Sequence, residues 1–229
     1  MPKINKILVV GAGISGLAVC YWLRRFGFSP VLIEKFSNLR KEGQALDFRG
    51  ASIDLLKKMN IYEKICNMRT RLKLGRYVDA EGNVLHEEKG ERFGFRQGED
   101  VEIARGDVAE ILMNAIEGIP CHFNQLIDSI EQNDRDVKVQ FKDGRVEHYD
   151  LVIGADGIHS TTRDMVFDKN EYKLVKLGMC FSVFSIPNYL NLSHIEVQCE
   201  VNQKLISITS DKNPNIAEVA VMFRMRNDG

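Results

Sequence analysis

The chain has 229 residues, of which 44% are hydrophobic and 28% are charged, and its formal net charge at pH 7 is −1. These values are typical of a soluble globular protein built as one large domain or two small ones. They argue against a nucleic-acid-binding surface, which needs an excess of positive charge, and no apolar run approaches the roughly 20 residues of a membrane span.

Cysteine usage favours a reducing compartment. The five cysteines are scattered and odd in number, with no C-x-x-C pair and no histidine at ligand spacing. We therefore expect packed, reduced thiols in a cytoplasmic protein, with neither a disulfide framework nor a metal site. The five positions are Cys20, Cys66, Cys121, Cys180 and Cys199.

The first forty residues predict a βαβ unit. Residues 6–10 are a continuous apolar run, as in a strand buried on both faces, and residues 30–34 repeat that pattern. Between them, residues 14–26 have helical periodicity and end at Gly27, a natural C-terminal cap. Glycines interrupt the first apolar run, so we interpret it as a strand and not as a signal peptide.

The middle of the chain mixes helices with hairpins. Residues 39–50 have weak periodicity and predict a loop. Short helices are expected at 51–59 and 106–116, and a hairpin at 76–86 with its turn at 80–83.

The second half is mostly strand. Residues 129–130 and 137–141 alternate and lead to Asp143-Gly144, a strong hairpin signal, before the buried run 151–153. After Arg163 the sequence pattern changes to strand-like segments with little helix between them. These segments predict an antiparallel sheet. These segments are residues 179–185, 196–201, 205–209 and 217–225.

The sequence Gly11-Ala-Gly-Ile-Ser-Gly16 follows the first strand and opens the first helix. In that context G-x-G-x-x-G predicts a dinucleotide site: Gly11 allows the turn, Gly13 lets a pyrophosphate approach, and Gly16 lets helix and strand pack closely. The helix N-terminus offers N–H groups to the phosphates. Glu34, at the end of the next strand, can accept both ribose hydroxyls, and its charge disfavours a 2′-phosphate. The motif alone leaves NAD and FAD open.

Residues 7–35 resemble the N-terminus of FAD-dependent hydroxylases of the para-hydroxybenzoate hydroxylase type, and the order and spacing are most similar to the tetracycline-inactivating monooxygenases. The segments 45–50 and 102–105 resemble the family's flavin-ring loop and FAD-contacting arginine. The segment Gly154-Ala-Asp-Gly157, with Ser160 and Arg163, resembles its second fingerprint. For Arg105 we also expect Asp107 to cap the following helix. His159 is interpreted as an exposed loop residue.

The resemblance implies FAD as cofactor and NADPH or NADH as reductant, with no catalytic side chain assigned and no metal ligand. A flavin hydroperoxide would hydroxylate a small, aromatic or polyketide-like substrate. The expected cofactor-binding residues, argued from the motif or added by the resemblance, are Gly11, Gly13, Ile14, Ser15, Gly16, Glu34, Lys35, Asp47, Arg49, Arg105, Leu126, Asp156, Gly157 and Arg163.

The predicted fold class is α/β: a Rossmann-like, GR2-type FAD-binding domain over residues 1–163, with an inserted hairpin around 75–88. Residues 164–229 would start an antiparallel substrate-binding subdomain. Nothing after Arg163 matches the family's third fingerprint, so we expect a chain truncated at its C-terminus.

Two alternatives stay open at this point. The chain could be a non-catalytic FAD- or nucleotide-binding module that needs a partner chain. An NAD-linked dehydrogenase is disfavoured, because residues 35–150 do not supply a second mononucleotide-binding half. The sequence leaves the substrate, the choice of reductant and the oligomeric state open.

Overall fold

The computed structural model describes residues 4–40, 43–89 and 97–225. The chain divides into two compact units, each made of two stretches. The first unit comprises Met1–Lys41 and Gly106–Leu174, and the second comprises Glu42–Arg105 and Val175–Gly229. In the described residues, no helix is both long and apolar enough to cross a membrane.

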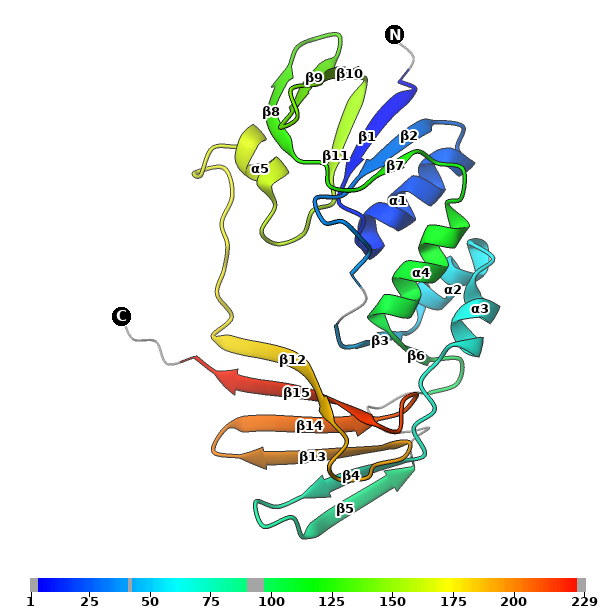
Figure 1. Ribbon diagram of the computed structural model, residues 1–229, viewed down its shortest axis with the longest axis vertical. Helices are drawn as coiled ribbons and strands as arrows, with labels where there is room; N and C mark the ends of the chain where they lie inside the picture. The colour runs from blue at the N-terminus through cyan, green and yellow to red at the C-terminus, as the bar shows by residue number, and fades with distance from the viewer. Residues whose placement is uncertain (1–3, 41–42, 90–96, 226–229) are drawn as a thin grey trace. The chain divides into compact units, whose positions relative to one another are not determined.

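The first unit contains a parallel sheet, a small antiparallel sheet and three helices among its described residues (Figure 1). Helix α4 begins at Arg105, the last residue of the second unit, and continues into the first. The elements are β1 Lys6–Val10, α1 Ile14–Arg25, β2 Ser29–Ile33, α4 Arg105–Ala115, β7 Cys121–His122, β8 Ile127–Gln132, β9 Val137–Phe141, β10 Val146–Tyr149, β11 Leu151–Gly154 and α5 Thr161–Val166.

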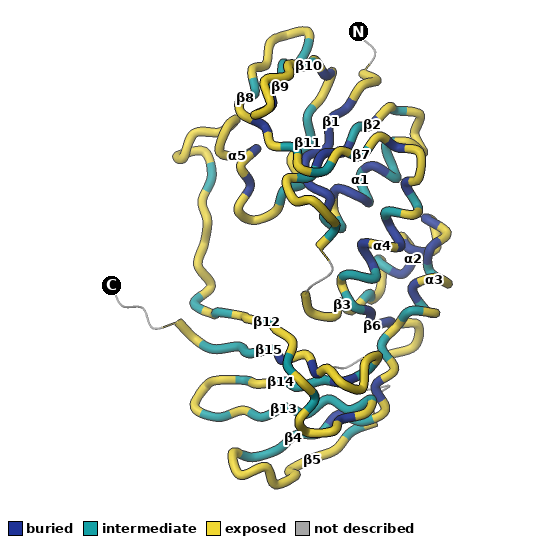
Figure 2. The backbone as a smooth tube through the Cα atoms, in the orientation of Figure 1, coloured by how far each residue is buried: buried dark blue, intermediate teal, exposed yellow. Residues whose placement is uncertain are grey.

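The parallel sheet has the strand order β11-β1-β2-β7. Strand β1 lies in the centre and four of its five residues are buried, which explains its unbroken apolar sequence (Figure 2). The small sheet, in the order β10-β9-β8, shares a core with it. The buried residues of that core are Leu8, Val10, Ile33, Ile127, Val139, Phe141 and Tyr149.

The second unit is built around a six-stranded sheet in the order β12-β15-β14-β13-β4-β5. All neighbours are antiparallel except β13 and β4, which run parallel with Ile195 opposite Leu74. The elements are β3 Ala45–Phe48, α2 Ala51–Lys58, α3 Tyr62–Asn67, β4 Leu74–Val78, β5 Val84–Lys89, β6 Val101–Ala104, β12 Met179–Pro187, β13 Ile195–Val201, β14 Lys204–Ser210 and β15 Ile216–Arg224.

The predicted α/β class, with its parallel sheet and later antiparallel sheet, is confirmed, as are the hairpin at 76–86 and the four late strands. The predicted loop at 39–50 is wrong, because β3 pairs there with β6. Asp107 does not cap α4 from outside, since the helix begins two residues earlier and contains it.

The boundaries of the two compact units differ from the expected division of the chain after residue 163. Hairpin β4–β5 joins the later strands in one sheet, so residues 42–105 belong with the second unit. The assignment of cofactor binding to residues 1–163 and of substrate binding to residues 164–229 stays a prediction.

Candidate functional site

The candidate site lies where three neighbouring parallel strands end. Val10 of β1 is in register with Gly154 of β11 on one side and with Ile33 of β2 on the other. The Gly11 N–H donates to Ile33 O, and the Ala155 N–H donates to Val10 O, both over 2.8 Å. Three segments therefore leave the sheet side by side: the glycine-rich loop, Glu34 and Gly154–Gly157. This is the edge at which α/β folds bind ligands.

The N-terminus of α1 has the features of a phosphate site. Gly13 is its N-cap and supplies no side-chain cap, and the first turn contains no acidic residue. The first N–H groups of a helix have no partner within it, so the backbone of Ile14, Ser15 and Gly16 offers donors and a partial positive charge to an anion. A Cβ at Gly13 would meet no atom of the described residues within 4 Å. The space before the helix is thus open to a ligand.

Gly11 joins the first loop to the second. Its φ is +103°, and a Cβ there would lie 2.7 Å from the Ala155 carbonyl oxygen and 2.9 Å from Asp156 Cα. A Cβ at Gly16 would lie 1.9 Å from Gly11 O. Both glycines are required for packing within the protein, whereas Gly13 faces open space.

The carboxylate of Glu34 is held at both oxygens. Oε2 accepts the Ala12 N–H over 2.8 Å, and Oε1 accepts the Phe36 N–H over 3.0 Å. A carboxylate oxygen has two acceptor sites, so each oxygen keeps capacity for a ribose hydroxyl. The same contacts hold the side chain in one orientation.

Asp156 uses its carboxylate within its own loop. Oδ1 accepts the Ser160 hydroxyl over 2.6 Å, and Oδ2 accepts the N–H and hydroxyl of Thr162 over 3.0 and 3.1 Å. A longer bond of 3.3 Å comes from the Thr161 hydroxyl. Burial raises the pKa of Asp156, but the hydrogen bonds from Ser160 and Thr162 outweigh it and leave the pKa below its ordinary value. This carboxylate is ionised and anchors the start of α5.

Arg163 completes that anchor. Its backbone N–H donates to Ser160 Oγ over 2.9 Å, and its Nη2 donates to Ile158 O over 2.8 Å, which closes the loop from Ile158 to the start of α5. The guanidinium lies over the Tyr172 ring at 4.6 Å, and its buried Nε has no hydrogen-bond partner among the described residues. The spacing S-x-x-R thus acts here as a helix cap with a backbone clamp.

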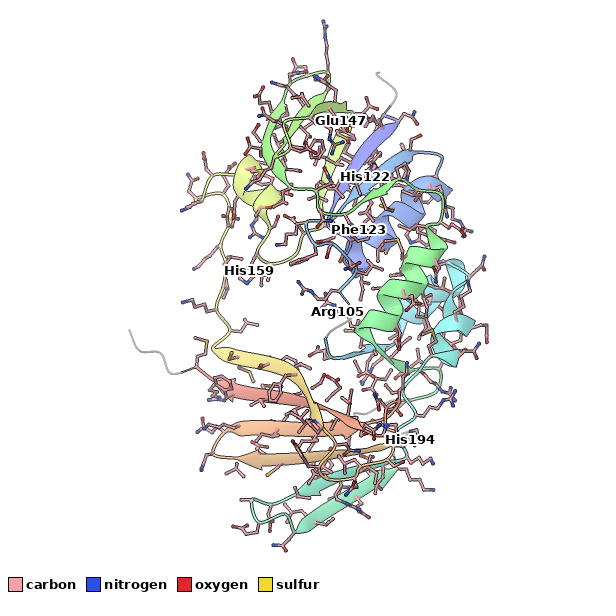
Figure 3. All side chains as sticks on the ribbon, viewed as in Figure 1. Arg105, His122, Phe123, Glu147, His159 and His194 are labelled. Carbon is pink, nitrogen blue, oxygen red and sulfur yellow. The ribbon has the colours of Figure 1, made fainter. Side chains whose placement is uncertain are left out.

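The remaining candidates of the first unit lie around the ends of β2 and β7. Lys35 is exposed, with its Nζ 5.2 Å from the centre of the Phe36 ring. Leu126 is 42% exposed, and its carbonyl oxygen accepts the Lys142 N–H. Figure 3 labels His122, the last residue of β7, and Phe123, which follows it.

Three candidates belong to the second unit. Asp47 of β3 forms a 2.8 Å ion pair with Arg49, and both side chains are partly exposed. Arg105, labelled in Figure 3, is exposed at the start of α4, where its N–H donates to Gln44 O. A Cβ at Gly43 would lie 3.1 Å from Arg105 Cδ, so this glycine gives the arginine room. The cofactor roles of all three stay predictions.

Sequence reasoning missed Thr162, and it noted Ser160 only as part of the second fingerprint. Both are among the few buried polar residues, and both bond to Asp156. The signal was present, since a serine three residues before a helical N–H is a capping pattern. Phe36 was also missed, because an exposed aromatic residue has no distinctive spacing.

The fold and the site together define a dinucleotide-binding α/β protein with a second, sheet-based unit. Consistent with this, a family model described as "FAD binding domain" matches residues 5–223. The chain belongs to this family, and the resemblance found in its sequence is confirmed.

Named relatives agree with this assignment. The chain is 62% identical over 224 residues to a flavin-dependent monooxygenase of Legionella longbeachae serogroup 1 (strain NSW150), covering 98% of this chain and 58% of the relative. It is also similar to the crystal structures of two tetracycline destructases. Tet(51) matches with a TM-score of 0.91 and 66% identity, and Tet(55) with 0.93 and 52%; the match covers 98% and 99% of this chain and 58% of each.

A more distant structure shares the fold alone. The crystal structure of CtdE in complex with FAD matches with a TM-score of 0.78 at 16% identity, covering 99% of this chain and 61% of that one. The chain therefore spans about three fifths of the length of the proteins it resembles.

Proposed function

We propose that this chain binds FAD and forms the cofactor-binding part of a flavin-dependent monooxygenase that uses NADPH or NADH and O₂ to hydroxylate a small molecule in the cytoplasm. The observation that carries the proposal is that β11, β1 and β2 pair in register, so that the three loops that follow them lie side by side. Each loop offers a different chemistry: backbone N–H groups, a carboxylate and a tightly closed turn.

The residues of the first unit fit FAD. The N–H groups of Ile14, Ser15 and Gly16 would hold the pyrophosphate, and the open space at Gly13 would admit it. Glu34 would accept the ribose hydroxyls through the free acceptor sites of its two oxygens. FAD, when bound, would supply the redox chemistry by accepting a hydride from the nicotinamide and activating O₂ for transfer to the substrate.

The segment Gly154–Gly157 would support the cofactor through its backbone. The Asp156 and Arg163 side chains form hydrogen bonds within the loop that leads from this segment to α5, and Gly157 is exposed with a φ of +87°. We propose further that Lys35 and Leu126 lie at the adenosine end of the cofactor. The cofactor roles of Asp47, Arg49 and Arg105 rest on the sequence resemblance alone.

The substrate class rests on the relatives. Two structures named tetracycline destructases are 66% and 52% identical to this chain, which favours an aromatic or polyketide-like substrate. The monooxygenase class rests on the same relatives and on the 62% identical flavin-dependent monooxygenase.

The test begins with the purified chain reconstituted with FAD and freed of unbound cofactor. We expect a retained flavin absorption spectrum and oxidation of NADPH or NADH in air. Retained FAD without any NAD(P)H oxidation would support a binding module that needs a partner chain. A protein that binds NAD⁺ but retains no FAD would indicate the dehydrogenase alternative.

The loop is tested by Gly13→Val. Because a Cβ at this position meets open space and φ is −74°, the variant should fold normally while its side chain obstructs the phosphates. We expect flavin retention to be lost. Asn114→Val, on an exposed position of α4, is the control and should retain flavin. Equal flavin content in the wild type and Gly13→Val would refute the role of the loop.

A further inference from the structure

Phe36 lies two residues beyond Glu34, and its backbone is fixed on both sides. Its N–H donates to Glu34 Oε1 over 3.0 Å, and its carbonyl oxygen accepts the Asn124 N–H over 3.1 Å. The Gln125 N–H also donates to Glu34 O over 2.9 Å. These bonds continue the pairing of β2 with β7 past the ends of both strands, so the position of Phe36 is set by the sheet.

The side chain of Phe36 is exposed although its backbone is fixed. Its exposed fraction is 48%, and two cations lie close to the ring. Lys35 Nζ is 5.2 Å and Arg40 Cζ is 5.6 Å from the ring centre, within the range of cation–π attraction. The exposed ring therefore carries cationic groups over it, just past the end of β2.

The strand order sets the order in which the parts of a bound dinucleotide would lie along this edge of the sheet. The phosphate site follows β1, and the ribose-binding carboxylate follows β2, its neighbour. The next group of a dinucleotide in that direction, toward β7, is the nucleobase. Phe36 and the partly exposed Leu126 lie there, on segments joined by the hydrogen bonds to Asn124 and Gln125.

We propose that Phe36, with Arg40, forms the surface on which the adenine of FAD stacks, and that this contact makes the chain select FAD over FMN. The inference rests on the proposed function and adds a residue that determines which flavin is bound. Aromatic rings and guanidinium planes both stack on nucleobases. FMN has no adenosine, so it gains nothing from this surface.

The test measures dissociation constants of FAD, ADP and FMN for the wild type and for Phe36→Ala. Loss of one stacked base weakens binding by about five- to 150-fold. We expect that loss for FAD and ADP, and no change for FMN. Phe36→Tyr should restore both affinities, because it keeps the ring.

Phe26→Ala is the matched control. Phe26 is 72% exposed and follows α1 in the same unit, stacked against Trp22. The Phe26→Ala variant should bind FAD, ADP and FMN as the wild type does. Arg40→Ala provides a second variant, for which we expect a smaller loss with the same preference for FAD and ADP.

Three outcomes would overturn the inference. Wild-type affinity for FAD and ADP in Phe36→Ala would refute it while leaving FAD binding intact. An equal loss for FAD and FMN would indicate a general disturbance of the site. A wild-type chain that binds neither FAD nor ADP would overturn the proposed function as well.

Discussion

Ser160 and Asp156 are joined by a hydrogen bond that serves two segments at once. The Ser160 hydroxyl donates to Asp156 Oδ1 over 2.6 Å, and Ser160 Oγ also accepts the Arg163 backbone N–H over 2.9 Å. One side chain therefore caps α5 and holds the acidic turn that packs against Gly11. The polar groups of the second loop therefore bond largely to one another.

Asp156→Asn should destabilise this turn. An amide cannot accept all the donors that the carboxylate accepts, and hydrogen bonds to charged groups contribute about 1.5–3 kcal/mol. Because Asp156 is partly exposed, we expect a loss near 1 kcal/mol. The midpoint of urea unfolding measures it, with Asp128→Asn on the exposed face of β8 as the control.

The same variant gives a pH test. The pKa of Asp156 is lowered in the folded protein, so its contribution to stability is present above the ordinary aspartate pKa of about 3.9 and is lost as the pH falls through the lower folded value. The stability difference between wild type and Asp156→Asn should be constant near neutral pH and shrink in acid. A difference that grows in acid would contradict the assignment.

Gly11→Ala and Gly13→Ala should separate packing from binding. At Gly11 the new methyl would lie 2.7 Å from a backbone oxygen and φ is +103°, so we expect a loss of about 1–3 kcal/mol in the free energy of unfolding. At Gly13 the methyl meets open space, and stability should be unchanged. Urea unfolding of both apoproteins decides this; equal losses would be the contrary result.

Arg24 closes the C-terminal end of α4. Its guanidinium donates to Glu117 O over 2.5 Å and to Ala115 O over 2.7 Å, where a positive charge also favours the helix dipole. Arg24→Ala should cost about 1–2 kcal/mol of stability. Arg24→Lys should recover only part, because an ammonium lacks the planar fork. Full recovery by lysine would show that charge alone matters.

Cys20 should be inert in the folded protein. It is fully buried in α1, and burial, aided by the nearby Cys121, raises the pKa of its thiol to about 12. Alkylation at mildly alkaline pH followed by peptide mapping should leave Cys20 unmodified and label it only after denaturation. The partly exposed Cys66 and Cys180 should react first. Rapid native labelling of Cys20 would contradict this packing.

The sequence predicted best what depends on neighbouring residues. The β1–α1–β2 unit follows from continuous apolar runs and a glycine turn, and 151–153 is recognisable for the same reason. Strand β3 was missed because its partner β6 lies more than fifty residues away in the chain, and a four-residue segment has too little pattern of its own.

The site was predictable to a similar extent. Gly11, Gly13 and Glu34 follow from a motif whose parts lie close together in the sequence, and the structure brings Glu34 to the Ala12 N–H at the ends of paired strands. Their cofactor roles stay predictions. The internal use of the Asp156 carboxylate was not predictable, because it depends on how α5 turns back onto its own N-terminus. The position of Phe36 was not predictable either, because it depends on hydrogen bonds from Asn124 and Gln125, which lie far away in the sequence.

The parallel register of β13 on β4 has a consequence for biosynthesis. The two strands lie about 120 residues apart in the sequence, so during translation the hairpin β4–β5 must wait, with its sheet edge unpaired, until β13 leaves the ribosome. The first unit can close earlier, once β11 has emerged. We expect the nascent chain to expose this hairpin longest, and slow synthesis there to favour chaperone capture.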